Sequence, residues 1–435
     1  MRYKKPNPNL FIRNRKAFAE KMEAHTIAVF HANDLMPSNG DASYRFVQNN
    51  NLYYLTGLDQ EEIILVIFPD APEERYREML FIKESNPHVQ VWEGWKYSKK
   101  EARACSGIES VFYYQDFEAS LNRLLYHFSG IYLDINEHDR SSTFVPTAAH
   151  RLANHFRKKY PTHQLLRAAP ILEDLRVIKG EEELSFIKKA IQITGDAFHR
   201  VLGFVEAEKW EYEIEAEILH EFFRQGASSP AFDTIVASGK DSCVLHYVHN
   251  DKQVAEGELI LIDMGARYGN YCADMTRTIP VDGHFTNRQR DIYKGTQAIL
   301  QFATSQLVIG NTFENYNLEV GKFITEQLLE LGLLSKEDLK DEKKDEPSAY
   351  RKYCMHGVSH FLGLDTHDVG NRYQSFQAGM LLTCEPGIYL PEEKIGIRLE
   401  NDILISEEGP VNLMEGILLE AEEIEEAMQK NKNRS

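Results

Sequence analysis

Two aspartates stand on neighbouring apolar runs in the stretch Glu258-Leu-Ile-Leu-Ile-Asp-Met-Gly-Ala-Arg-Tyr-Gly-Asn-Tyr-Cys-Ala-Asp-Met-Thr-Arg-Thr-Ile279. The runs have the composition of β-strands, and one turn signal, Tyr268-Gly269, separates them. Glycine supplies the positive φ that a tight turn requires. With Tyr268 and Gly269 as the two loop residues, Asp263 lies opposite Asp274. The stretch therefore predicts an antiparallel hairpin with two facing carboxylates.

Facing carboxylates require a compensating cation. Opposed residues of antiparallel strands have Cβ atoms roughly 5 Å apart, and like charges at that distance destabilise the sheet. A solvated hairpin with two exposed acids is the alternative. However, Asp263 closes an apolar run and Asp274 lies between Ala273 and Met275. Because charged residues are seldom buried without a partner, the pattern favours a metal site.

Three histidines follow in the segment His356-Gly-Val-Ser-His-Phe-Leu-Gly-Leu-Asp-Thr-His-Asp-Val-Gly370. Histidine is the commonest protein metal ligand and the usual acid or base near neutral pH. His356 and His360 would share one face of a helix, but the glycines of the segment argue against a regular helix. Spacing alone leaves open which histidine binds metal. A hydrogen-bonded core histidine is the alternative for each of them.

Two further acids interrupt strand-like runs, Met380-Leu-Leu-Thr-Cys-Glu-Pro-Gly-Ile-Tyr389 and Ile395-Gly-Ile-Arg-Leu-Glu-Asn-Asp-Ile-Leu-Ile405. Glu385 precedes a Pro-Gly turn signal, which ends the strand where the carboxylate projects. Its alternative is a solvated acid at a strand end. Arg398 and Glu400 share a face if the second run is extended, so an ion pair between them is the alternative for Glu400.

These motifs resemble aminopeptidase P (Xaa-Pro aminopeptidase) of the pita-bread metallopeptidase superfamily, which also holds prolidases, methionine aminopeptidases and metal-free creatinases. The resemblance covers nearly the whole chain and includes several more motifs in fixed order: Phe46-Val-Gln-Asn-Asn-Asn-Leu-Tyr-Tyr-Leu-Thr-Gly57, Thr234-Ile-Val-Ala-Ser-Gly239, Leu245-His-Tyr247 and Ile397-Arg-Leu-Glu400. It implies an N-terminal α/β domain of the aminopeptidase P type followed by a pita-bread catalytic domain. Relatives form dimers and tetramers, so we expect a homo-oligomer.

The resemblance also implies a role for each site residue. It implies five metal ligands: Asp263, Asp274, His360, Glu385 and Glu400. Asp274 and Glu400 would bridge two ions. The remaining histidines, His246, His356 and His367, become groups beside the ligands or in contact with substrate, and we expect His246 and His367 to bind it.

The donor set indicates the chemistry. Four carboxylates and one imidazole suit Mn²⁺ better than a thiolate-rich zinc site would, and the resemblance favours Mn²⁺ as well. Two divalent ions roughly 3.5 to 4 Å apart hold a bridging hydroxide that attacks the scissile carbonyl. Glu385 is the candidate to accept the water's proton and pass it to the departing amine. His246 or His367 would help a metal to stabilise the oxyanion, while Arg398 orients the carboxylates without transferring a proton.

Substrate choice follows from the resemblance, which implies release of the first residue from peptides whose second residue is proline. A bond to proline has no N–H to donate, so a pocket shaped for the ring can select it. Trp92 and Tyr54 are candidates to line that pocket, with the hydrophobic core as the alternative. A prolidase (Xaa-Pro dipeptidase) would share every ligand. A non-catalytic pita-bread binding module and a metal-free creatinase-like hydrolase are disfavoured because the ligands are intact.

Patterning along the chain predicts an α/β (α+β) protein of two domains, 1–173 and 174–435. A helix is expected over Phe11 to Ala24, and strands over Thr26 to Phe30 and Ile131 to Asp134. Long amphipathic helices are expected over Glu181 to Val205 and Glu211 to Gln225, ahead of the strands that carry the ligands.

Composition agrees with an ordinary globular enzyme, with 435 residues, 43% hydrophobic and 27% charged. The formal net charge of -18 argues against nucleic acid or an anionic membrane as partner. The chain starts without a secretory h-region, and its longest apolar run, Ile63 to Phe68, is too short for a membrane span, so we expect a cytoplasmic protein. The five cysteines show no C-x-x-C spacing and are predicted to be small buried residues.

Overall fold

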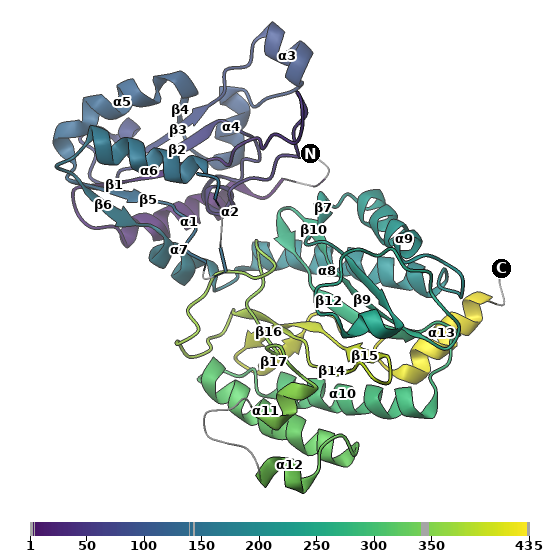
Figure 1. Ribbon diagram of the computed structural model, residues 1–435. Coiled ribbons are helices and arrows are strands. Elements are labelled where there is room, and N and C mark those ends of the chain that lie inside the picture. Colours follow the sequence, from purple (N-terminus) through teal and green to yellow (C-terminus); the bar gives the residue numbers. More distant parts are fainter. Residues whose placement is uncertain (1–2, 4, 139, 142–143, 341–347, 433–435) are drawn as a thin grey trace. The chain divides into compact units, whose positions relative to one another are not determined.

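The computed structural model describes residues 3, 5–138, 140–141, 144–340 and 348–432 (Figure 1). The chain divides into two compact units, Lys5–Arg176 and Val177–Ser435, the second of which includes residues 1–4. Residue 174, where the sequence pattern changes, lies in the last helix of the first unit. Within the described residues, none of the helices combines the length and the apolar character that a membrane span requires.

The N-terminal unit is built on one six-stranded mixed sheet in the spatial order β4-β3-β2-β1-β5-β6. Its strands are β1 (Thr26–His31), β2 (Ile63–Ile67), β3 (Glu78–Ile82), β4 (Ser110–Tyr113), β5 (Gly130–Leu133) and β6 (Gln164–Arg167). The central strand β1 runs antiparallel to β2 and parallel to β5. The predicted strands at Thr26 and Ile131 are therefore confirmed as β1 and β5, side by side in this sheet.

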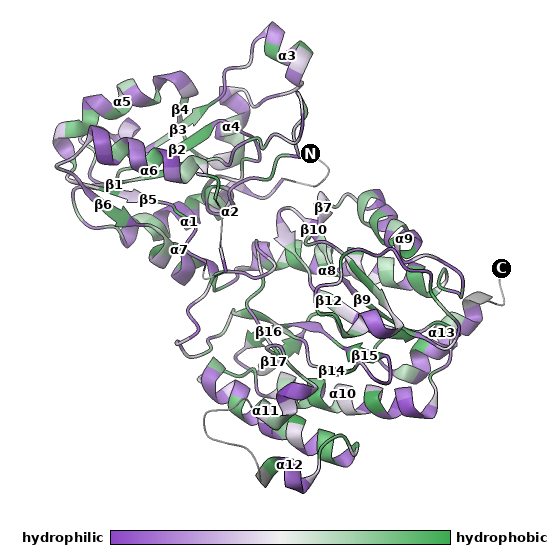
Figure 2. Cartoon of the chain, in the orientation of Figure 1, coloured by the Kyte–Doolittle hydropathy of each residue, from purple (hydrophilic) through white to green (hydrophobic). Residues whose placement is uncertain are grey.

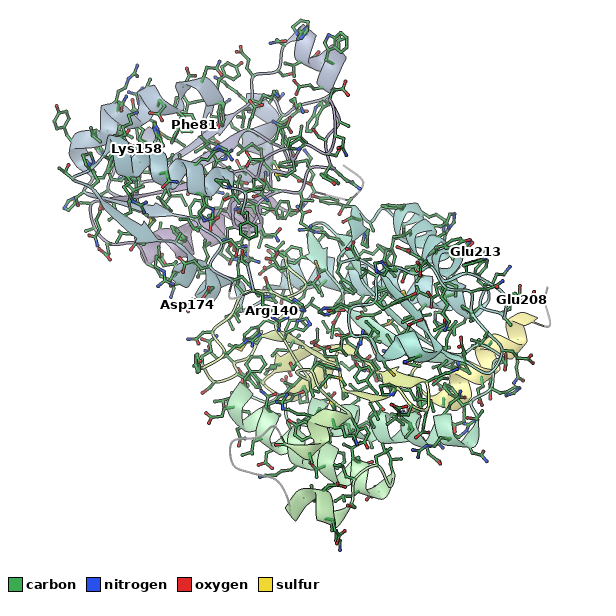
Figure 3. All side chains as sticks on the ribbon, viewed as in Figure 1. Phe81, Arg140, Lys158, Asp174, Glu208 and Glu213 are labelled. Carbon is green, nitrogen blue, oxygen red and sulfur yellow. The ribbon has the colours of Figure 1, made fainter. Side chains whose placement is uncertain are left out.

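Helices cover both faces of this sheet. They are α1 (Pro8–Glu20), α2 (Asn50–Thr56), α3 (Pro87–Glu93), α4 (Lys99–Ser106), α5 (Phe117–Leu124), α6 (Ala148–Lys159) and α7 (Ala169–Arg176). Phe81 of β3, labelled in Figure 3, packs edge-on against Phe117 of α5 with ring centroids 5.4 Å apart. On the opposite face, Phe18 of α1 meets Phe30 of β1 at 5.3 Å. This unit therefore has a hydrophobic core on each side of the sheet.

Helix α1 begins and ends earlier than the sequence predicted. The Asn7 side chain accepts a hydrogen bond from the amide of Asn9, and Pro8 occupies the first helical position, where its missing N–H costs nothing. The helix ends at Glu20 rather than at Ala24. Capping chemistry at the start therefore decided the boundary, which apolar periodicity alone could not locate.

The second unit holds the long helices that the sequence predicted. Its helices are α8 (Glu181–Leu202), α9 (Glu211–Arg224), α10 (Asn287–Ser305), α11 (Phe313–Glu330), α12 (Lys336–Lys340) and α13 (Ala421–Lys432). Helices α8 and α9 pack on each other, as do α10 and α11. Figure 1 shows these two pairs on opposite sides of the strands, and Figure 2 shows green apolar strands between helices whose exposed faces are purple and polar.

Four small sheets lie between these helix pairs. Their strands are β7 (Ser229–Pro230) with β10 (Ala266–Tyr268) and β11 (Tyr271–Cys272), β8 (Ile235–Ser238) with β9 (Leu259–Met264) and β12 (Met275–Pro280), β13 (Leu381–Cys384) with β16 (Asn401–Ser406) and β17 (Gly409–Asn412), and β14 (Gly387–Leu390) with β15 (Ile395–Arg398). The expected strand over Ile395 to Ile405 is thus two strands, β15 and β16, in different sheets. Glu400 lies at the bend between them.

The aspartate hairpin is present, but its predicted register was wrong. Tyr268 pairs with Tyr271, so the loop residues are Gly269 and Asn270, with φ values of 58° and 65°. A two-residue turn of this type needs positive φ at both loop positions, which asparagine tolerates and tyrosine disfavours. Asp263 consequently pairs with Thr276 rather than with Asp274. Moving the turn by one residue shifts the pairing by two, so both aspartates still occupy one face as diagonal neighbours.

A buried ion pair fixes the histidine segment to the start of the second unit. Lys179 Nζ lies 2.8 Å from Asp368 Oδ2, and each side chain is 1% exposed. The Lys179 backbone amide also donates to the carbonyl of Gly379. A Cβ at Gly363 would lie 2.1 Å from Asp368 Oδ2, so only glycine fits at this position beside the ion pair. The pair therefore holds the loop that follows His360 in place.

Replacement of Asp368 by asparagine tests this anchor. Removing one partner breaks a buried ion pair of Lys179, so Asp368→Asn is expected to lower the free energy of unfolding by about 3 to 5 kcal/mol. The matched control is Glu426→Gln, which breaks the exposed Lys430–Glu426 pair and should cost less than about 1 kcal/mol. Urea unfolding of both variants measures the difference, and equal small losses would contradict the anchoring role of the buried pair.

Candidate metal centre

The five predicted ligands come from positions at or beside strand ends. Asp263 is the only one inside a strand, near the end of β9. Asp274 lies between β11 and β12, Glu385 directly follows β13, and Glu400 connects β15 to β16. His360 precedes the isolated β-bridge between Phe361 and Leu382. As predicted, its segment is irregular rather than helical.

The ligand atoms of these residues converge. His360 Nε2 lies 3.5 Å from Asp274 Oδ2 and 3.5 Å from Glu385 Oε1. Asp274, His360 and Glu400 each offer one ligand atom, and these atoms lie within 4.8 Å of one another. The charge of Asp263 raises the pKa of both Asp274 and Glu400, so Asp263 belongs to the same cluster. Residues separated by more than one hundred positions in sequence thus form one group.

The His360 ring is oriented for coordination. Its Nδ1 lies 2.9 Å from the carbonyl oxygen of Phe361, and the backbone amide of His360 donates to Thr383 Oγ1. A carbonyl can only accept, so Nδ1 carries the proton and Nε2 presents a lone pair toward Asp274 and Glu385. The neighbouring backbone therefore selects the tautomer that a metal ligand requires.

The carboxylates repel one another in a buried environment. Burial raises the pKa of Asp274 well above its usual range, and the charges of Asp263, Asp402 and Glu385 raise it further. Burial likewise raises the pKa of Glu400 well above its usual range, with Asp274 and Glu385 as the next causes. Asp263 Oδ1 is buried without a hydrogen-bond partner among the residues that the structure describes.

A pair of divalent cations fits this donor set. Buried carboxylates that raise one another's pKa are stable as anions only when positive charge compensates them. Arg398 supplies one such charge, since its Nη2 lies 2.6 Å from Asp263 Oδ2. Apart from that ion pair, oxygen atoms of Asp274, Glu385 and Glu400 lie close to Nε2 of His360. Hard oxygen donors with one imidazole form a suitable site for divalent ions of the Mn²⁺ type.

Arg398 links the carboxylates to His356 through Tyr389. Arg398 Nη1 donates to the Tyr389 hydroxyl at 3.1 Å, and that hydroxyl lies 2.7 Å from His356 Nε2. His356 Nδ1 lies 2.8 Å from the carbonyl of Gly357. Burial, followed by the charge of Arg398, lowers the pKa of His356 to about 4. His356 is therefore neutral near pH 7, with a proton on Nδ1 and a lone pair that accepts from Tyr389.

The other two histidines lie around this cluster. His367 stacks edge-on against His360, with ring centroids 4.4 Å apart and an interplanar angle of 89°. His246 is exposed, and its charge contributes to the lowered pKa of His356. The structure thus brings all the predicted site residues into one region.

Three residues of the site escaped the sequence analysis. Thr276 Oγ1 donates to Glu400 Oε2 at 2.7 Å and accepts from Arg398 Nε at 3.1 Å. Tyr389 joins Arg398 to His356. Asp402 is fully buried, and its Oδ2 accepts the backbone N–H of Asp274 at 3.3 Å. Asp402 interrupts an apolar run just as Glu400 does, so the criterion that selected Glu400 could have found it.

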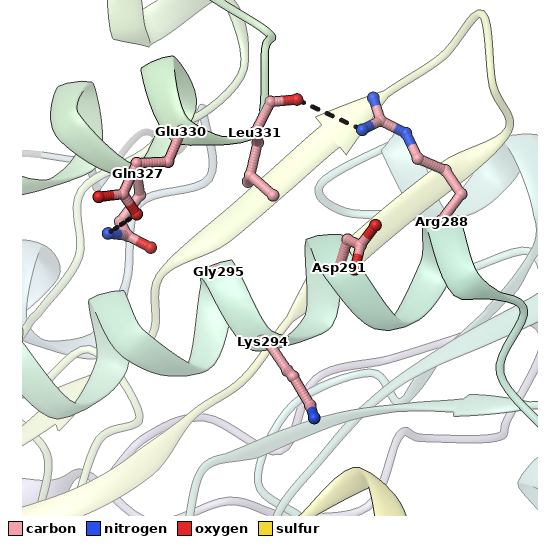
Figure 4. A pocket seen from close by; sticks show the side chains of 7 residues that line it. All are labelled: Arg288, Asp291, Lys294, Gly295, Gln327, Glu330 and Leu331. Carbon is pink, nitrogen blue, oxygen red and sulfur yellow. Dashed lines mark hydrogen bonds between the residues drawn. The ribbon is translucent and has the colours of Figure 1, made fainter.

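A surface hollow lies elsewhere in this unit. It has a volume of about 380 Å³ and is lined by residues of α10 and α11 together with Leu331 (Figure 4). Arg288 donates to the Leu331 carbonyl at 3.4 Å, and Gln327 donates to Glu330 at 3.0 Å. Its lining mixes both signs of charge and includes none of the predicted site residues. This hollow is a groove between two helices rather than part of the candidate site.

Comparison with known proteins identifies the family. A model of metallopeptidase family M24 matches residues 185–407, and a model of the aminopeptidase P N-terminal domain matches residues 11–132. The chain is 32% identical to the Xaa-Pro aminopeptidase of Escherichia coli over 96% of this chain and 97% of that protein. The chain belongs to the aminopeptidase P family. A second Xaa-Pro aminopeptidase, from Haemophilus influenzae, is 31% identical over 98% of both chains.

A solved structure extends the likeness to three dimensions. Zinc-substituted Escherichia coli aminopeptidase P in complex with product superposes with a TM-score of 0.88 at 30% identity, over 98% of this chain and 99% of that one. The predicted family and fold class are confirmed, with an N-terminal aminopeptidase P domain followed by a pita-bread catalytic domain. As a member of the aminopeptidase P family, the chain is a metallopeptidase.

Asp402 is expected to strengthen metal binding in this member of the family. Its carboxylate stands behind Asp274 and adds negative charge, whereas Asp402→Asn keeps an oxygen that can accept the Asp274 N–H. This variant should bind Mn²⁺ about tenfold more weakly, the usual order for a partner of a metal ligand. Its metal-free form should be at least as stable as wild type because one repulsion is removed.

Calorimetric titration with Mn²⁺ measures the affinity, and thermal unfolding without metal measures the stability. The matched control is Asp291→Asn on the exposed face of α10, which should leave the affinity unchanged. Wild-type affinity in Asp402→Asn would show that this carboxylate has no part in metal binding.

Proposed function

We propose that this chain is a Xaa-Pro aminopeptidase, which removes the first residue from peptides whose second residue is proline. The observation that carries the proposal is the convergence of Asp274, Glu385 and Glu400 on Nε2 of His360. The Escherichia coli relative is a Xaa-Pro aminopeptidase that matches 96% of this chain. The alternative within the superfamily, a prolidase, would use the same ligands.

In the proposed mechanism, Asp263, Asp274, His360, Glu385 and Glu400 would hold two divalent ions. When bound, the ions supply hydroxide from water at neutral pH and polarise the scissile carbonyl. We propose Mn²⁺ as the metal, because four carboxylates and one imidazole form a hard donor set. Thr276 and Arg398 fix the outer oxygens of Glu400 and Asp263 by hydrogen bonds of 2.7 Å and 2.6 Å.

Glu385 is the proposed proton carrier. Its Oε1 lies against His360, and its Oε2 lies 3.8 Å from His356 Nδ1. The side chain is 18% exposed, so it can be reached by water and by a bound peptide. Glu385 would accept the proton of the attacking water and pass it to the prolyl nitrogen as the bond breaks. That nitrogen must be protonated, because a secondary amine leaves poorly as an anion.

The histidines are proposed to act on the substrate. His246 and His367 would contact the peptide and stabilise the negative oxygen that develops on the carbonyl. His356 is neutral and is held by Tyr389, so it would contribute a fixed dipole rather than a charge. Arg398 would act through Asp263 and Tyr389 by orientation, without giving up a proton.

Tyr54 and Trp92, the two residues predicted to line the proline pocket, lie in the N-terminal unit and differ in burial. Tyr54 is 4% exposed and belongs to the core of that unit, which was the alternative for it. Trp92 is 77% exposed on α3, so the core alternative was wrong for Trp92. A contact of Trp92 with substrate stays a prediction, as do the homo-oligomer and the cytoplasmic location.

A comparison of three peptides tests the proposed activity. Protein stripped with a chelator and reloaded with Mn²⁺ should release the first amino acid from a Xaa-Pro-Xaa tripeptide. Release from the matched Xaa-Ala-Xaa tripeptide should be slower by about 10²-fold or more, because a pocket shaped for proline leaves the peptide N–H unpaired. Elemental analysis of the same sample reports the metal content.

Two outcomes would contradict the proposal. Cleavage of a Xaa-Pro dipeptide without cleavage of the tripeptide would identify a prolidase. A metal-loaded protein that turns over none of the peptides would identify a non-catalytic binding module.

The variant Glu385→Gln tests the proton carrier. An amide cannot accept the water's proton, so kcat on the tripeptide should fall by about 10²- to 10⁴-fold. The matched control is Glu393→Gln, which removes the surface pair between Glu393 and Arg288 and should retain full activity. Metal content must be measured for each variant. A metal-loaded Glu385→Gln protein with kcat within a few-fold of wild type would exclude Glu385 as the base.

A further inference from the structure

His246 belongs to a segment without regular strand structure, residues 239–252, which we call the His246 segment. Alternate side chains turn inward along it: Cys243, Leu245 and Tyr247 are partly buried and pack on a cluster that includes Leu261 and Tyr389. The side chains between them, including His246 and Val248, are exposed. The segment begins with the 3-10 helix Gly239–Cys243 and passes through a turn at Leu245 and His246, where neighbouring side chains leave the backbone in different directions. The packing of Leu245 and Tyr247 therefore decides which way His246 faces.

One carboxylate in α9 binds the His246 segment at two places and also binds the residue before it. Glu211, the first residue of α9, is fully buried. Its Oε1 accepts the backbone N–H and the hydroxyl of Ser238, both at 2.8 Å. Its Oε2 accepts the Tyr247 hydroxyl at 2.7 Å and the backbone N–H of Lys252 at 3.0 Å. Four hydrogen bonds thus join a single carboxylate to the residue before the segment, to its middle and to its end.

The Tyr247 contact is held as a neutral donor. Its hydroxyl lies nearer to Glu211 than to Asp251, which is 3.3 Å away. Burial, followed by the adjacent Glu211 carboxylate, raises the pKa of Tyr247. The hydroxyl therefore keeps its proton and donates it to Glu211.

The opposite side of the His246 segment rests on the strand that carries Arg398. A Cβ at Gly396 of β15 would lie 2.2 Å from the carbonyl oxygen of Ser242, so the two backbones are in close contact. Cys243 Sγ also donates to the Ile395 carbonyl at 3.4 Å. The segment is therefore held between α9 and β15. Tyr389, in the cluster on which Tyr247 packs, bonds in turn to His356 and Arg398.

We propose that Glu211 is a positioning residue for His246. Through the Tyr247 hydroxyl and the amides at both ends of the segment, it fixes the backbone from which the exposed imidazole reaches the substrate. This inference rests on the proposed function, since only that function gives His246 a substrate to contact. Glu211 itself touches no reacting group.

The hydrogen-bond inventory explains why a carboxylate is required. Four donors converge on Glu211, and an ionised carboxylate offers two oxygens that only accept. Glutamine offers one accepting oxygen, and its amide N–H groups would face the Tyr247 hydroxyl and the Lys252 amide, or those of Ser238. The variant Glu211→Gln therefore leaves buried donors unpaired, whereas Tyr247→Phe removes one donor, the hydroxyl that meets Glu211 and Asp251, and keeps the ring.

A double-mutant cycle tests the inference in the full-length, Mn²⁺-loaded protein. Glu211→Gln should lower kcat/KM on a Xaa-Pro-Xaa tripeptide by about 10- to 100-fold, the order that a shift of ~1 Å in a positioned group costs. Tyr247→Phe should lower it by about 3- to 10-fold, in line with one lost hydrogen bond. In a His246→Ala background, Glu211→Gln should cost less than about threefold, because its effect passes through the imidazole that is absent.

Matched controls separate positioning from general loss of stability. Glu217 lies on the same helix as Glu211, and Glu217→Gln breaks its contact with Arg200 of α8. Tyr212→Phe removes an exposed hydroxyl one residue after Glu211. Both controls should keep wild-type kcat/KM, and all variants should keep wild-type metal content. If Glu211→Gln costs the same factor with and without His246, Glu211 does not act through His246 and the inference fails. The inference would also be overturned if the single variants Tyr247→Phe and Glu211→Gln both kept wild-type kcat/KM.

Amide hydrogen exchange distinguishes failure of this inference from failure of the proposed function. A wild-type protein that cleaves no proline peptide refutes the function. In that case, faster exchange at Ser238 and Lys252 in Glu211→Gln than in Glu217→Gln still supports the hold on the segment. Equal exchange in the two variants would refute it.

Discussion

Buried carboxylates that repel one another govern how the second unit is built. Asp263, Asp274, Glu385 and Glu400 are brought together by segments that are distant in sequence, and burial makes their mutual repulsion strong. Only the positive charge of Arg398 and divalent cations can make such a cluster stable as anions. The fold must therefore hold these residues together against a force that would separate them, and most of the second unit can be understood as the means of doing so.

Short strands and fixed contacts supply that restraint. Each ligand lies at or near a strand end, where the sheet determines its position while the side chain remains free to face the cluster. Thr276, Arg398 and Tyr389 connect the acids to His356 through short hydrogen bonds. The buried pair of Lys179 and Asp368 holds the histidine segment from behind. Flexibility is thereby removed from the metal-binding side of the site, and Glu211 does the same for the side that faces the substrate.

Much of this architecture could be predicted from sequence because it is written in local patterns. Apolar periodicity predicted α8 and α9, and acids that interrupt apolar runs pointed to the four carboxylates that converge at the candidate site. The hairpin register was wrong because the turn depends on which two residues tolerate positive φ, and Gly269 was paired with the wrong neighbour. The face of both aspartates was nevertheless right, since an error of two positions keeps the alternation of side chains.

The remaining features depend on tertiary contacts that no single segment encodes. Asp402 becomes significant only when its oxygen meets the amide of Asp274, and Tyr389 only when Arg398 and His356 approach it from two sides. The bend at Glu400 divides one predicted strand into β15 and β16, because the two halves join different sheets. Glu211 is an ordinary first-turn acid of a helix by sequence, and its four donors come from residues up to 41 positions away.

The placement of the ligands at the ends of separate small sheets affects the resistance of the protein to proteolysis. Cations bound there would add cross-links between segments that Thr276 and Arg398 already join by hydrogen bonds, so loss of metal would loosen several strand ends together. Susceptibility to proteases would then follow the free concentration of metal, and a shortage of metal would reduce the abundance of the enzyme as well as its turnover.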